Sequence, residues 1–382
     1  MYQVLLITAI VLTTLYCLLI ILYRRWFLEL PRFEAPNNLI PQTRFSVIIP
    51  ARNEAENVDQ FLPSILEQQY PSELFEVIVI NDHSTDDTAE RVRLLQLKYS
   101  HLSLIELSDH VEQGATNAYK KKAIEIAIAQ SKGDWIVTTD ADCNADSAWL
   151  KQYDAYIQVK QPVFIAAPVM FFNTGTFLSI FQVLDFMSLQ GITAAAVSAG
   201  SHAMCNGANL AYLKTAFYEV GQFKGIDHIA SGDDMLLMQK IKQKFPGKLG
   251  YLFQEKAIIQ TAAMPDWKSF LNQRIRWASK ADSYQDKRIF WVLLMVYLLN
   301  LALLMLSIAA SFEVNGWNHF VMLVSIKTIV ELSFMIPISR FFGLIEIMGW
   351  FPLMQPFHML YTVIAGWLGK FGSYQWKGRK LQ

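Results

Sequence analysis

The chain has 382 residues, of which 53% are apolar and only 17% are charged. This apolar excess is unusual for a soluble protein of this length, and it predicts that part of the chain lies in lipid. The 33 basic residues balance the 33 acidic residues, so the composition gives no reason to expect a nucleic-acid partner. The 3 cysteines form neither a metal-ligand spacing nor a disulfide framework, which fits a reducing compartment.

The N-terminal segment predicts a retained membrane anchor. Residues 4–23 carry no charge and are long enough to cross ~30 Å of hydrocarbon as a helix. Arg24 and Arg25 follow this run, whereas a cleaved signal peptide carries its positive charge before the apolar residues. The positive-inside rule then places the N-terminus outside a bacterial-type inner membrane and the chain from residue 24 onward in the cytoplasm.

Near the C-terminus, residues 290–312 and 320–338 predict two further spans. Lys327 and Glu331 lie inside the second, at a spacing that allows them to pair on one helix face and that points to the interior of a helix bundle. Residues 341–368 are again apolar but interrupted by glycine and proline, so they predict either a third span or an interfacial piece followed by a short crossing. We favour the second option because it keeps the basic tail cytoplasmic; this tail holds Lys370, Lys377, Arg379 and Lys380.

Between these ends, short apolar runs alternate with segments of helical spacing. We expect strands at 45–49, 75–80, 102–107 and 135–139, and helices at 57–69, 88–98 and 121–130. Strands that alternate with helices of this length predict a parallel sheet with crossover helices. Ligands of such a sheet bind beyond the carboxyl ends of its strands.

Three of these four strands are followed by polar residues, at 50–54, 81–86 and 140–142. Any one such cluster is explained by turn and helix-cap chemistry, but that explanation is weaker for three clusters at one sheet edge. Asp140 and Asp142 can both turn toward one hard cation. Mg²⁺ or Mn²⁺ takes one or two carboxylates together with phosphate oxygens, so this pair predicts a metal site.

Seven motifs follow one another in a recognisable order. They are SVIIPARNE (46–54), VINDHSTD (79–86), KKKAI (120–124), TTDADC (138–143), CNGANLAY (205–212), SGDDMLL (231–237) and QRIRW (273–277). With them the chain resembles inverting glycosyltransferases of family 2, among the membrane-bound members related to ceramide glucosyltransferase and to hyaluronan, chitin and cellulose synthases. The resemblance implies an α/β domain of the GT-A fold, with a mixed, mainly parallel sheet that binds a nucleotide sugar, flanked by one N-terminal and two or three C-terminal transmembrane helices. The expected organisation is an anchor at 1–30, a cytoplasmic catalytic domain with interfacial helices at 44–288, and a transmembrane region with a basic tail at 289–382.

The resemblance also implies roles on the donor side. The residues that would bind the nucleotide sugar are Pro50, Ala51, Arg52, Glu54, Asp82, Lys121 and Asp140. Asp142, with Asp140 beside it, would hold Mg²⁺ or Mn²⁺ on the diphosphate. Tyr119 stands where the family often has a glycine before its lysines, and the alternative for the three lysines is a solvated helix start.

On the acceptor side, Asp234 matches the catalytic base, which takes the proton of the acceptor hydroxyl. Asp233 stands where the family usually has glutamate, and both carboxylates also suit a helix start. The residues that would contact the acceptor or the diphosphate are Asp233, Gln273, Arg276 and Trp277. The alternative for this helix is an amphipathic helix at the membrane surface.

Residues 163–199 are unusually apolar for a soluble domain. They predict either an interfacial helix lining a lipid-facing groove or ordinary core packing. Asp185 lies within this stretch, and the sequence assigns it no role.

These observations together predict transfer of one sugar, with inversion, from a nucleotide sugar to a lipid or saccharide acceptor delivered at the membrane. A UDP-sugar is favoured over GDP-mannose. The alternative within the same chemistry is a processive polysaccharide synthase, for which three or four spans are few. A non-catalytic membrane scaffold is disfavoured because the expected carboxylates, Asp82, Asp140, Asp142 and Asp234, are all present.

Overall fold

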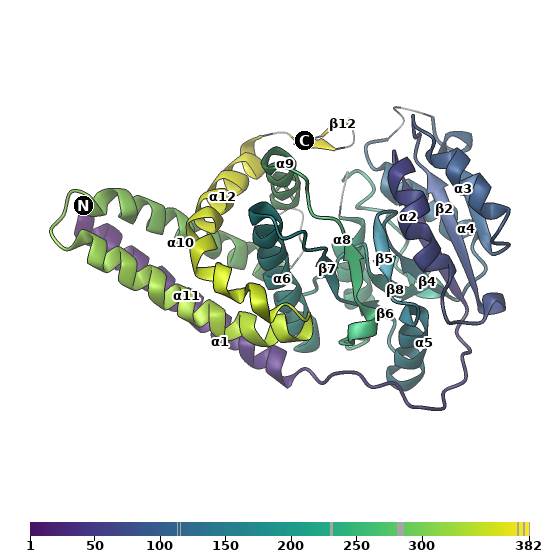
Figure 1. Cartoon of the computed structure of the whole chain (residues 1–382), viewed down its shortest axis with the longest axis horizontal. Coiled ribbons are helices and arrows are strands. Elements are labelled where there is room, and N and C mark those ends of the chain that lie inside the picture. The colour runs from purple at the N-terminus through teal and green to yellow at the C-terminus, as the bar shows by residue number, and fades with distance from the viewer. Residues whose placement is uncertain are drawn as a thin grey trace. The chain divides into compact units, whose positions relative to one another are not determined.

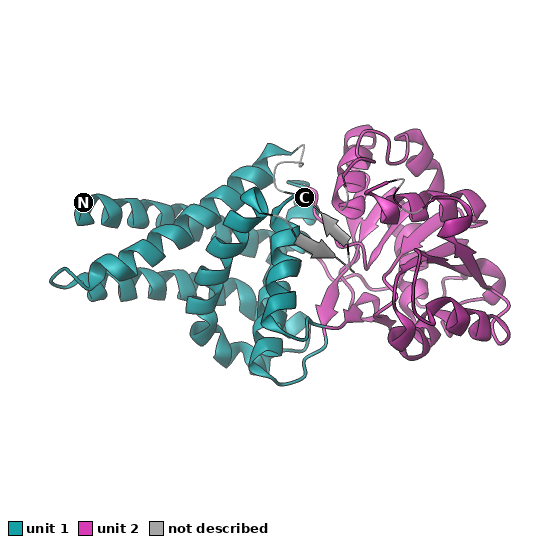
Figure 2. Cartoon of the chain, turned by 90° about the horizontal axis from the view of Figure 1, so that it is seen from above, with its two compact units in different colours: residues 1–30, 172–202, 263–382 teal, residues 31–171, 203–262 magenta. Residues whose placement is uncertain are grey.

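The computed structural model describes residues 1–112, 114, 116–229, 232–280, 286–372, 374–376 and 379–381. Two compact units make up the chain (Figure 2). The first, here called the helical unit, contains residues 1–30, 172–202 and 263–382; the second, here called the sheet unit, contains residues 31–171 and 203–262. Four residues named in the sequence analysis lie wholly or partly outside the described residues. They are Ser231 of the SGDDMLL motif, Lys377, and the side chains of Arg379 and Lys380.

The sheet unit is built on a seven-stranded sheet (Figure 1). Its order is β3 (Leu102–Glu106), β2 (Phe75–Asn81), β1 (Phe45–Ala51), β4 (Trp135–Thr138), β8 (Leu210–Leu213), β6 (Phe164–Ala166) and β9 (Leu249–Tyr251). The first four strands are parallel, β8 runs antiparallel to both of its neighbours, and β9 is parallel to β6. The expectation of a mixed, mainly parallel sheet is therefore confirmed.

The expected strands form because their apolar runs are buried on both faces, as parallel strands with crossover helices require. Val47, Val77 and Ile136 are fully buried in three neighbouring strands. The first strand extends beyond the expected 45–49, because Pro50 and Ala51 continue in register beside Ile80 and Asn81. Two residues expected in a loop therefore belong to the sheet.

Six helices and a second, three-stranded sheet complete the described part of this unit. The helices are α2 (Ala55–Leu66), α3 (Thr88–Gln96), α4 (Tyr119–Gln130), α5 (Trp149–Lys160), α7 (Lys214–Glu219) and α8 (Asp233–Lys244). The second sheet has the order β5 (Cys143–Ala145), β10 (Ile259–Thr261) and β7 (Val169–Phe171). Short 3₁₀ turns lie at Ser72–Leu74, Leu107–Asp109 and Glu255–Ala257.

The helical unit contains α1 (Tyr2–Glu29), α6 (Phe177–Ser198), α9 (Trp267–Ala278), α10 (Lys287–Ala310), α11 (Gly316–Phe341) and α12 (Phe351–Phe371). A 3₁₀ segment at Ile345–Trp350 precedes α12, and two short strands, β11 (Tyr374–Trp376) and β12 (Arg379–Leu381), follow it. Among the described residues, α1, α6, α10 and α11 are the helices long and apolar enough to cross a membrane. Candidate spans are thus found at the N-terminal segment and at both of the first two C-terminal segments. The 341–368 stretch is not one of these four helices; it divides into the 3₁₀ segment and α12.

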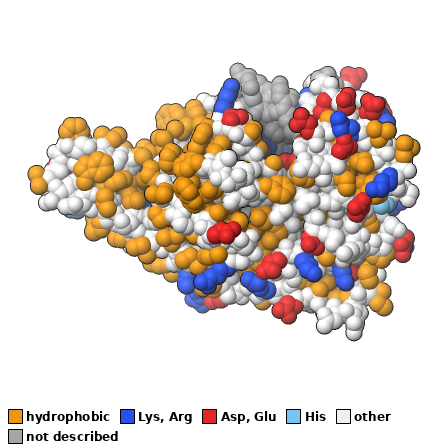
Figure 3. Space-filling view, viewed as in Figure 1, with side chains coloured by type: hydrophobic (Ala, Val, Ile, Leu, Met, Phe, Trp, Pro, Cys, Tyr) orange, Lys and Arg blue, Asp and Glu red, His pale blue; other side chains and the backbone are white. Residues whose placement is uncertain are grey.

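The four apolar helices differ in how much of their surface the protein covers. In the most apolar window of α1 only 28% of the residues are buried, whereas in that of α6 83% are buried. Exposed apolar side chains therefore cover α1, α10 and α11, as the space-filling view shows (Figure 3). By contrast, α6 is a core helix of its unit.

The apolar stretch at 163–199 therefore has two destinations. Its first part forms β6 and β7 of the sheet unit, and its second part forms α6 of the helical unit. Core packing, one of the two alternatives, explains most of its apolar character because β6 is fully buried and α6 nearly so. Residues 172–202 and the residues from 263 onward belong to the helical unit, so the expected 44–288 domain extends over parts of both compact units.

Candidate active site

The nucleotide-side residues lie where β1 and β2 end. The guanidinium of Arg52 donates through Nη1 to the backbone carbonyls of Asp82, at 2.7 Å, and His83, at 3.1 Å. The backbone N–H of Asp82 donates to the carbonyl of Ala51 at 2.8 Å. The side chains of Arg52 and Asp82 are only 10% and 4% exposed. These contacts hold the ends of β1 and β2 together. The structure thus brings together the predicted residues Ala51, Arg52 and Asp82.

Other polar side chains of the loops after β1 and β2 accept hydrogen bonds from backbone N–H groups. The hydroxyl of Ser84 accepts from the N–H of Asn53, and the carboxylate of Asp86 accepts from the N–H groups of Ala55 and Thr88. Although partial burial opposes it, hydrogen bonds from Thr88 and Ala55 lower the pKa of Asp86. Glu54 precedes α2, and its carboxylate accepts from Nδ2 of Asn57 at 2.6 Å. Turn and cap chemistry, the simpler alternative for these clusters, therefore applies here: Ser84 joins the two loops, and Asp86 accepts from the first N–H group of α2 and of α3.

A cluster of carboxylates around one lysine lies beyond the end of β4. The ammonium of Lys120, at the start of α4, is 2.8 Å from Oδ1 of Asp140 and 3.6 Å from Oδ2 of Asp233. Burial alone would lower the pKa of Lys120, but the charges of Asp140, Asp233 and Asp234 raise it above its ordinary value. Lys120 is therefore a protonated ammonium group among three acidic side chains.

Asp142 is oriented by the second sheet. The hydroxyl of Thr261, at the end of β10, donates to Oδ2 of Asp142 at 3.1 Å, and Sγ of Cys143 lies 3.7 Å from Oδ1. Burial, with the nearby charges of Asp142 and Asp140, raises the pKa of Cys143 well above its ordinary value. Cys143 is thus a neutral thiol at neutral pH.

Asp233 and Asp234 begin α8, directly after Gly232, whose φ of 77° lies in the left-handed region. Oδ2 of Asp234 accepts from the N–H of Gly207 at 3.0 Å, and Oδ1 accepts from the N–H of Met235 at 2.7 Å. The carbonyl of Gly207 in turn accepts from the hydroxyl of Thr138, at the end of β4. The CNGANLAY motif therefore positions the carboxylate predicted as the base.

The QRIRW motif lies on α9, in the helical unit. Gln273 and Trp277 are one turn apart, and the guanidinium of Arg274 lies between them: its Nη1 donates to Oε1 of Gln273 at 2.5 Å, and its Cζ is 4.3 Å from the centre of the Trp277 ring. Arg276 lies in the last turn of the helix. The motif therefore belongs to the helical unit, whereas the carboxylate cluster belongs to the sheet unit.

Comparison with known families decides the classification of the chain. The profile described as "Glycosyl transferase family 2" matches residues 46–221, and that described as "Glycosyl transferase family group 2" matches residues 135–368. The second match covers more than half of the chain. The chain belongs to glycosyltransferase family 2.

Individual relatives are more distant. Glycosyltransferase AglE of Haloferax volcanii is 36% identical over 107 residues, which are 28% of this chain and 33% of that protein. Poly-beta-1,6-N-acetyl-D-glucosamine synthase of Staphylococcus epidermidis is 25% identical over 269 residues, covering 70% of this chain and 61% of the synthase. The chain therefore spans less than two thirds of the length of either curated relative.

Among solved structures, the mannosyltransferase PcManGT from Pyrobaculum calidifontis, in complex with GDP-Man and Mn²⁺, is similar with a TM-score of 0.62. The similarity covers 93% of this chain and 99% of the other, at 19% sequence identity. At this identity the comparison shows the fold. The fold is that of the GT-A type.

The oxygen ligands at this family 2 site suit a divalent cation that is shared with a substrate. Among the described residues, no group of three acidic, histidine or cysteine side chains converges to hold a metal ion alone. Asp140 and Asp142 are two hard oxygen donors at the end of β4, and Mg²⁺ or Mn²⁺ needs only one or two carboxylates when phosphate oxygens complete its shell. The residues present therefore fit a metal that is bound together with a diphosphate.

Sequence reasoning placed Lys121, rather than Lys120, in the donor site. In the structure Lys121 is 2% exposed and its Nζ donates to the backbone carbonyl of Ile229. Lys120 contacts the carboxylates instead. Adjacent residues of a helix point about 100° apart, so only one lysine of the KKK run can face the strand ends, and the sequence does not say which. Tyr119, in place of the usual glycine, packs edge-on against the His83 ring.

Proposed function

We propose that this chain is an inverting glycosyltransferase that transfers a sugar from a nucleotide-sugar donor, with a UDP-sugar favoured, to an acceptor at a membrane. The observation that carries the proposal is the cluster of Asp140, Asp233 and Asp234 around Lys120, beyond the strand ends of a family 2 chain. Membership of the family supplies the reaction class. The cluster supplies the charged groups which that reaction needs.

In this proposal Arg52 and Asp82, at the ends of β1 and β2, bind the nucleotide. The base and the ribose present hydrogen-bond donors that a carboxylate can accept. Lys120 contributes positive charge for the diphosphate, with which its ammonium can form charged hydrogen bonds. A divalent metal, held by Asp142 and Asp140, would neutralise charge on the departing diphosphate. These residues bind the donor and keep its anomeric carbon in a fixed orientation.

Asp234 is the proposed base. It takes the proton of the acceptor hydroxyl while that oxygen attacks the anomeric carbon on the face opposite the diphosphate. The bond between the anomeric carbon and the diphosphate oxygen breaks, and its electron pair leaves with the nucleoside diphosphate. Two backbone N–H groups, of Gly207 and Met235, fix the orientation of the Asp234 carboxylate for this step.

The membrane setting of the proposal is supported by the apolar surfaces of α1, α10 and α11. Arg24 and Arg25 follow the apolar core of α1, which favours an N-terminus outside the cell and a catalytic domain in the cytoplasm. We propose a lipid acceptor, because few helices are available to build a pore for polymer export. The processive alternative is favoured by one observation, the 25% identity to a polysaccharide synthase over 70% of the chain.

A donor panel tests the proposal. The full chain, purified in lipid nanodiscs and supplied with a lipid extract of its host, is given UDP-glucose, UDP-N-acetylglucosamine or GDP-mannose with Mn²⁺ or Mg²⁺. We expect nucleoside diphosphate release with one donor, its loss on chelation with EDTA, and a new glycolipid by thin-layer chromatography. Asp142→Asn should require more metal, whereas Asp227→Asn, an exposed acidic control, should not. Absence of turnover with every donor would overturn the function, and a long polymer in place of a glycolipid would overturn the lipid acceptor.

A further inference from the structure

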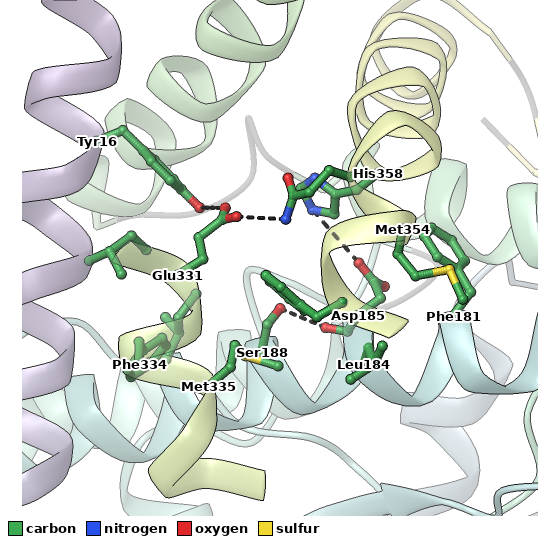
Figure 4. A pocket seen from close by; sticks show the side chains of 14 residues that line it. Tyr16, Phe181, Leu184, Asp185, Ser188, Glu331, Phe334, Met335, Met354 and His358 are labelled. Carbon is green, nitrogen blue, oxygen red and sulfur yellow. Dashed lines mark hydrogen bonds and ion pairs between the residues drawn. The ribbon is translucent and has the colours of Figure 1, made fainter. Parts of the chain in front are cut away.

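Asp185, on α6, is a buried acidic residue whose side chain has three polar neighbours. Its side chain is only 3% exposed, and its Oδ2 accepts from Nε of Arg274 at 2.9 Å and from Nη2 of the same residue at 2.6 Å. The hydroxyl of Tyr361 donates to Oδ1, and Nε2 of His358 lies 4.0 Å from that oxygen, as the close-up shows for the histidine (Figure 4). Asp185 therefore joins α6 to α9 and α12.

Arg274, the partner of Asp185, is the second residue of the QRIRW motif. Two nitrogens of Arg274 donate to Asp185 and the third donates to Gln273. The Cζ atom of Arg274 lies over two aromatic rings, 4.3 Å from the centre of Trp277 and 4.6 Å from that of Phe270. A guanidinium is planar, so fixing its edge on one carboxylate also fixes where its face and its remaining nitrogen lie. The orientation of Gln273 and Trp277 therefore depends on Asp185 through Arg274.

We propose that Asp185 is a positioning residue for the QRIRW motif: it holds Arg274, and Arg274 holds Gln273 and Trp277 in the geometry that the transfer reaction requires. The inference rests on the proposed function and on the expected contact of Gln273 and Trp277 with the acceptor or the diphosphate. It assigns a role to a carboxylate that lies outside every family motif named above.

The cavity beside Asp185 is too small to be a substrate site, so substrate binding there is not an alternative role for this residue. It has a volume of about 70 Å³ and lies among α1, α6, α11 and α12. Ligand pockets are commonly ~300–1,000 Å³, so this space suits a few water molecules rather than a sugar or a lipid headgroup. Asp185 faces this space, but its ion pair is with Arg274.

A second ion pair in the same unit provides a matched control. Lys327 and Glu331, on α11, are 2.7 Å apart and 1% and 8% exposed, a burial similar to that of Arg274 and Asp185 at 4% and 3%. Glu331 also accepts from Tyr16 and Gln355, on α1 and α12. None of these recorded partners lies on α9. Glu331→Gln thus removes an equally buried charge without touching the motif helix.

The test uses the full chain in nanodiscs and the donor that gives turnover in the panel. We expect Asp185→Asn to lower kcat about 10²-fold, as a misplaced active-site group does, while the donor KM and the gel-filtration profile stay near wild type. Glu331→Gln should keep the wild-type kcat, measured below the unfolding temperature of every variant. Asp185→Glu keeps a carboxylate for Arg274, and it should recover most of the lost activity.

Equal kcat in Asp185→Asn and Glu331→Gln, or no recovery in Asp185→Glu, would overturn the positioning role and leave the proposed function intact. If Asp185→Asn does not fold, Arg274→Lys replaces it. This variant keeps the ion pair but loses the planar contacts to Gln273 and Trp277, so kcat should still fall, and an unchanged kcat would overturn the inference. A wild-type chain without turnover on any donor would overturn the proposed function itself.

Discussion

The two units of the chain hold their acidic residues in different ways. In the sheet unit, Lys120 lies between Asp140 and Asp233, and the three side chains are 23%, 38% and 13% exposed. In the helical unit, the pairs of Asp185 with Arg274 and of Glu331 with Lys327 are at most 8% exposed. The first cluster has more acidic groups than basic ones, and the pairs in the second are balanced.

This difference separates groups that can exchange partners from groups that cannot. A partly exposed carboxylate can leave a lysine for a metal ion or a substrate because water and the ligand compensate the lost contact. A buried ion pair has no such replacement, since loss of one partner leaves an unpaired charge in a poorly solvated place. We therefore expect changes in the sheet-unit cluster to alter activity, and changes in the Lys327–Glu331 pair to alter stability.

The largest expected effect is the loss of the proposed base. Asp234→Asn should lower kcat by about 10²–10⁴-fold, the usual contribution of a general base, because asparagine cannot take the acceptor proton. The unfolding temperature should change little. The measurement is nucleotide release at saturating donor, with Asp227→Asn as the control at an exposed site. A variant that keeps wild-type kcat would remove Asp234 from the mechanism.

The next effect is one of stability. Glu331→Gln should destabilise the helical unit by about 3 kcal/mol, because it leaves the buried Lys327 ammonium without its charged partner. Thermal unfolding followed by circular dichroism in nanodiscs measures this change. The variant should retain kcat at temperatures where it is folded. A large loss of kcat without a change in unfolding temperature would erase the contrast between the two units.

The smallest expected effect concerns Lys120, whose carboxylate partners are partly exposed. Lys120→Met should raise the donor KM about tenfold, the effect of losing one charged hydrogen bond to the diphosphate. Half-maximal activity should need less metal, because Asp140 loses the ammonium that competes for its oxygen. Lys122→Met is the control, since Lys122 lies on the same helix with a side chain 50% exposed. An unchanged KM in both variants would show that Lys120 is only a structural counter-ion.

Much of the fold followed from local pattern. The strands at β1 to β4 are short apolar runs bounded by polar residues, and parallel strands buried on both faces need that composition. The two-residue extension of β1 was not predictable, since proline at position 50 normally ends a strand and is kept here by the register with β2. The division of residues 163–199 between the two units was not predictable either. An apolar stretch has the same composition whether it packs in a sheet or in a helix bundle.

The candidate site was predictable to the level of the motif and not always to the level of the residue. The carboxylates at 82, 140, 142 and 234 follow strand ends or begin a helix, and the structure finds them there. The choice between Lys120 and Lys121 depended on the rotation of α4, which tertiary packing sets. Asp185 gave no local signal, since its partner Arg274 is 89 residues away in sequence.

The sequence by itself therefore determined the family, the order of the motifs along the chain and the presence of apolar helices. These features depend only on residue type and spacing. The tertiary structure alone decided which lysine meets the carboxylates, which apolar helix is a core helix, and which buried acid holds the QRIRW motif. Those choices depend on contacts between residues far apart in sequence, and the burial of a charge is stable only when such a distant partner is in place.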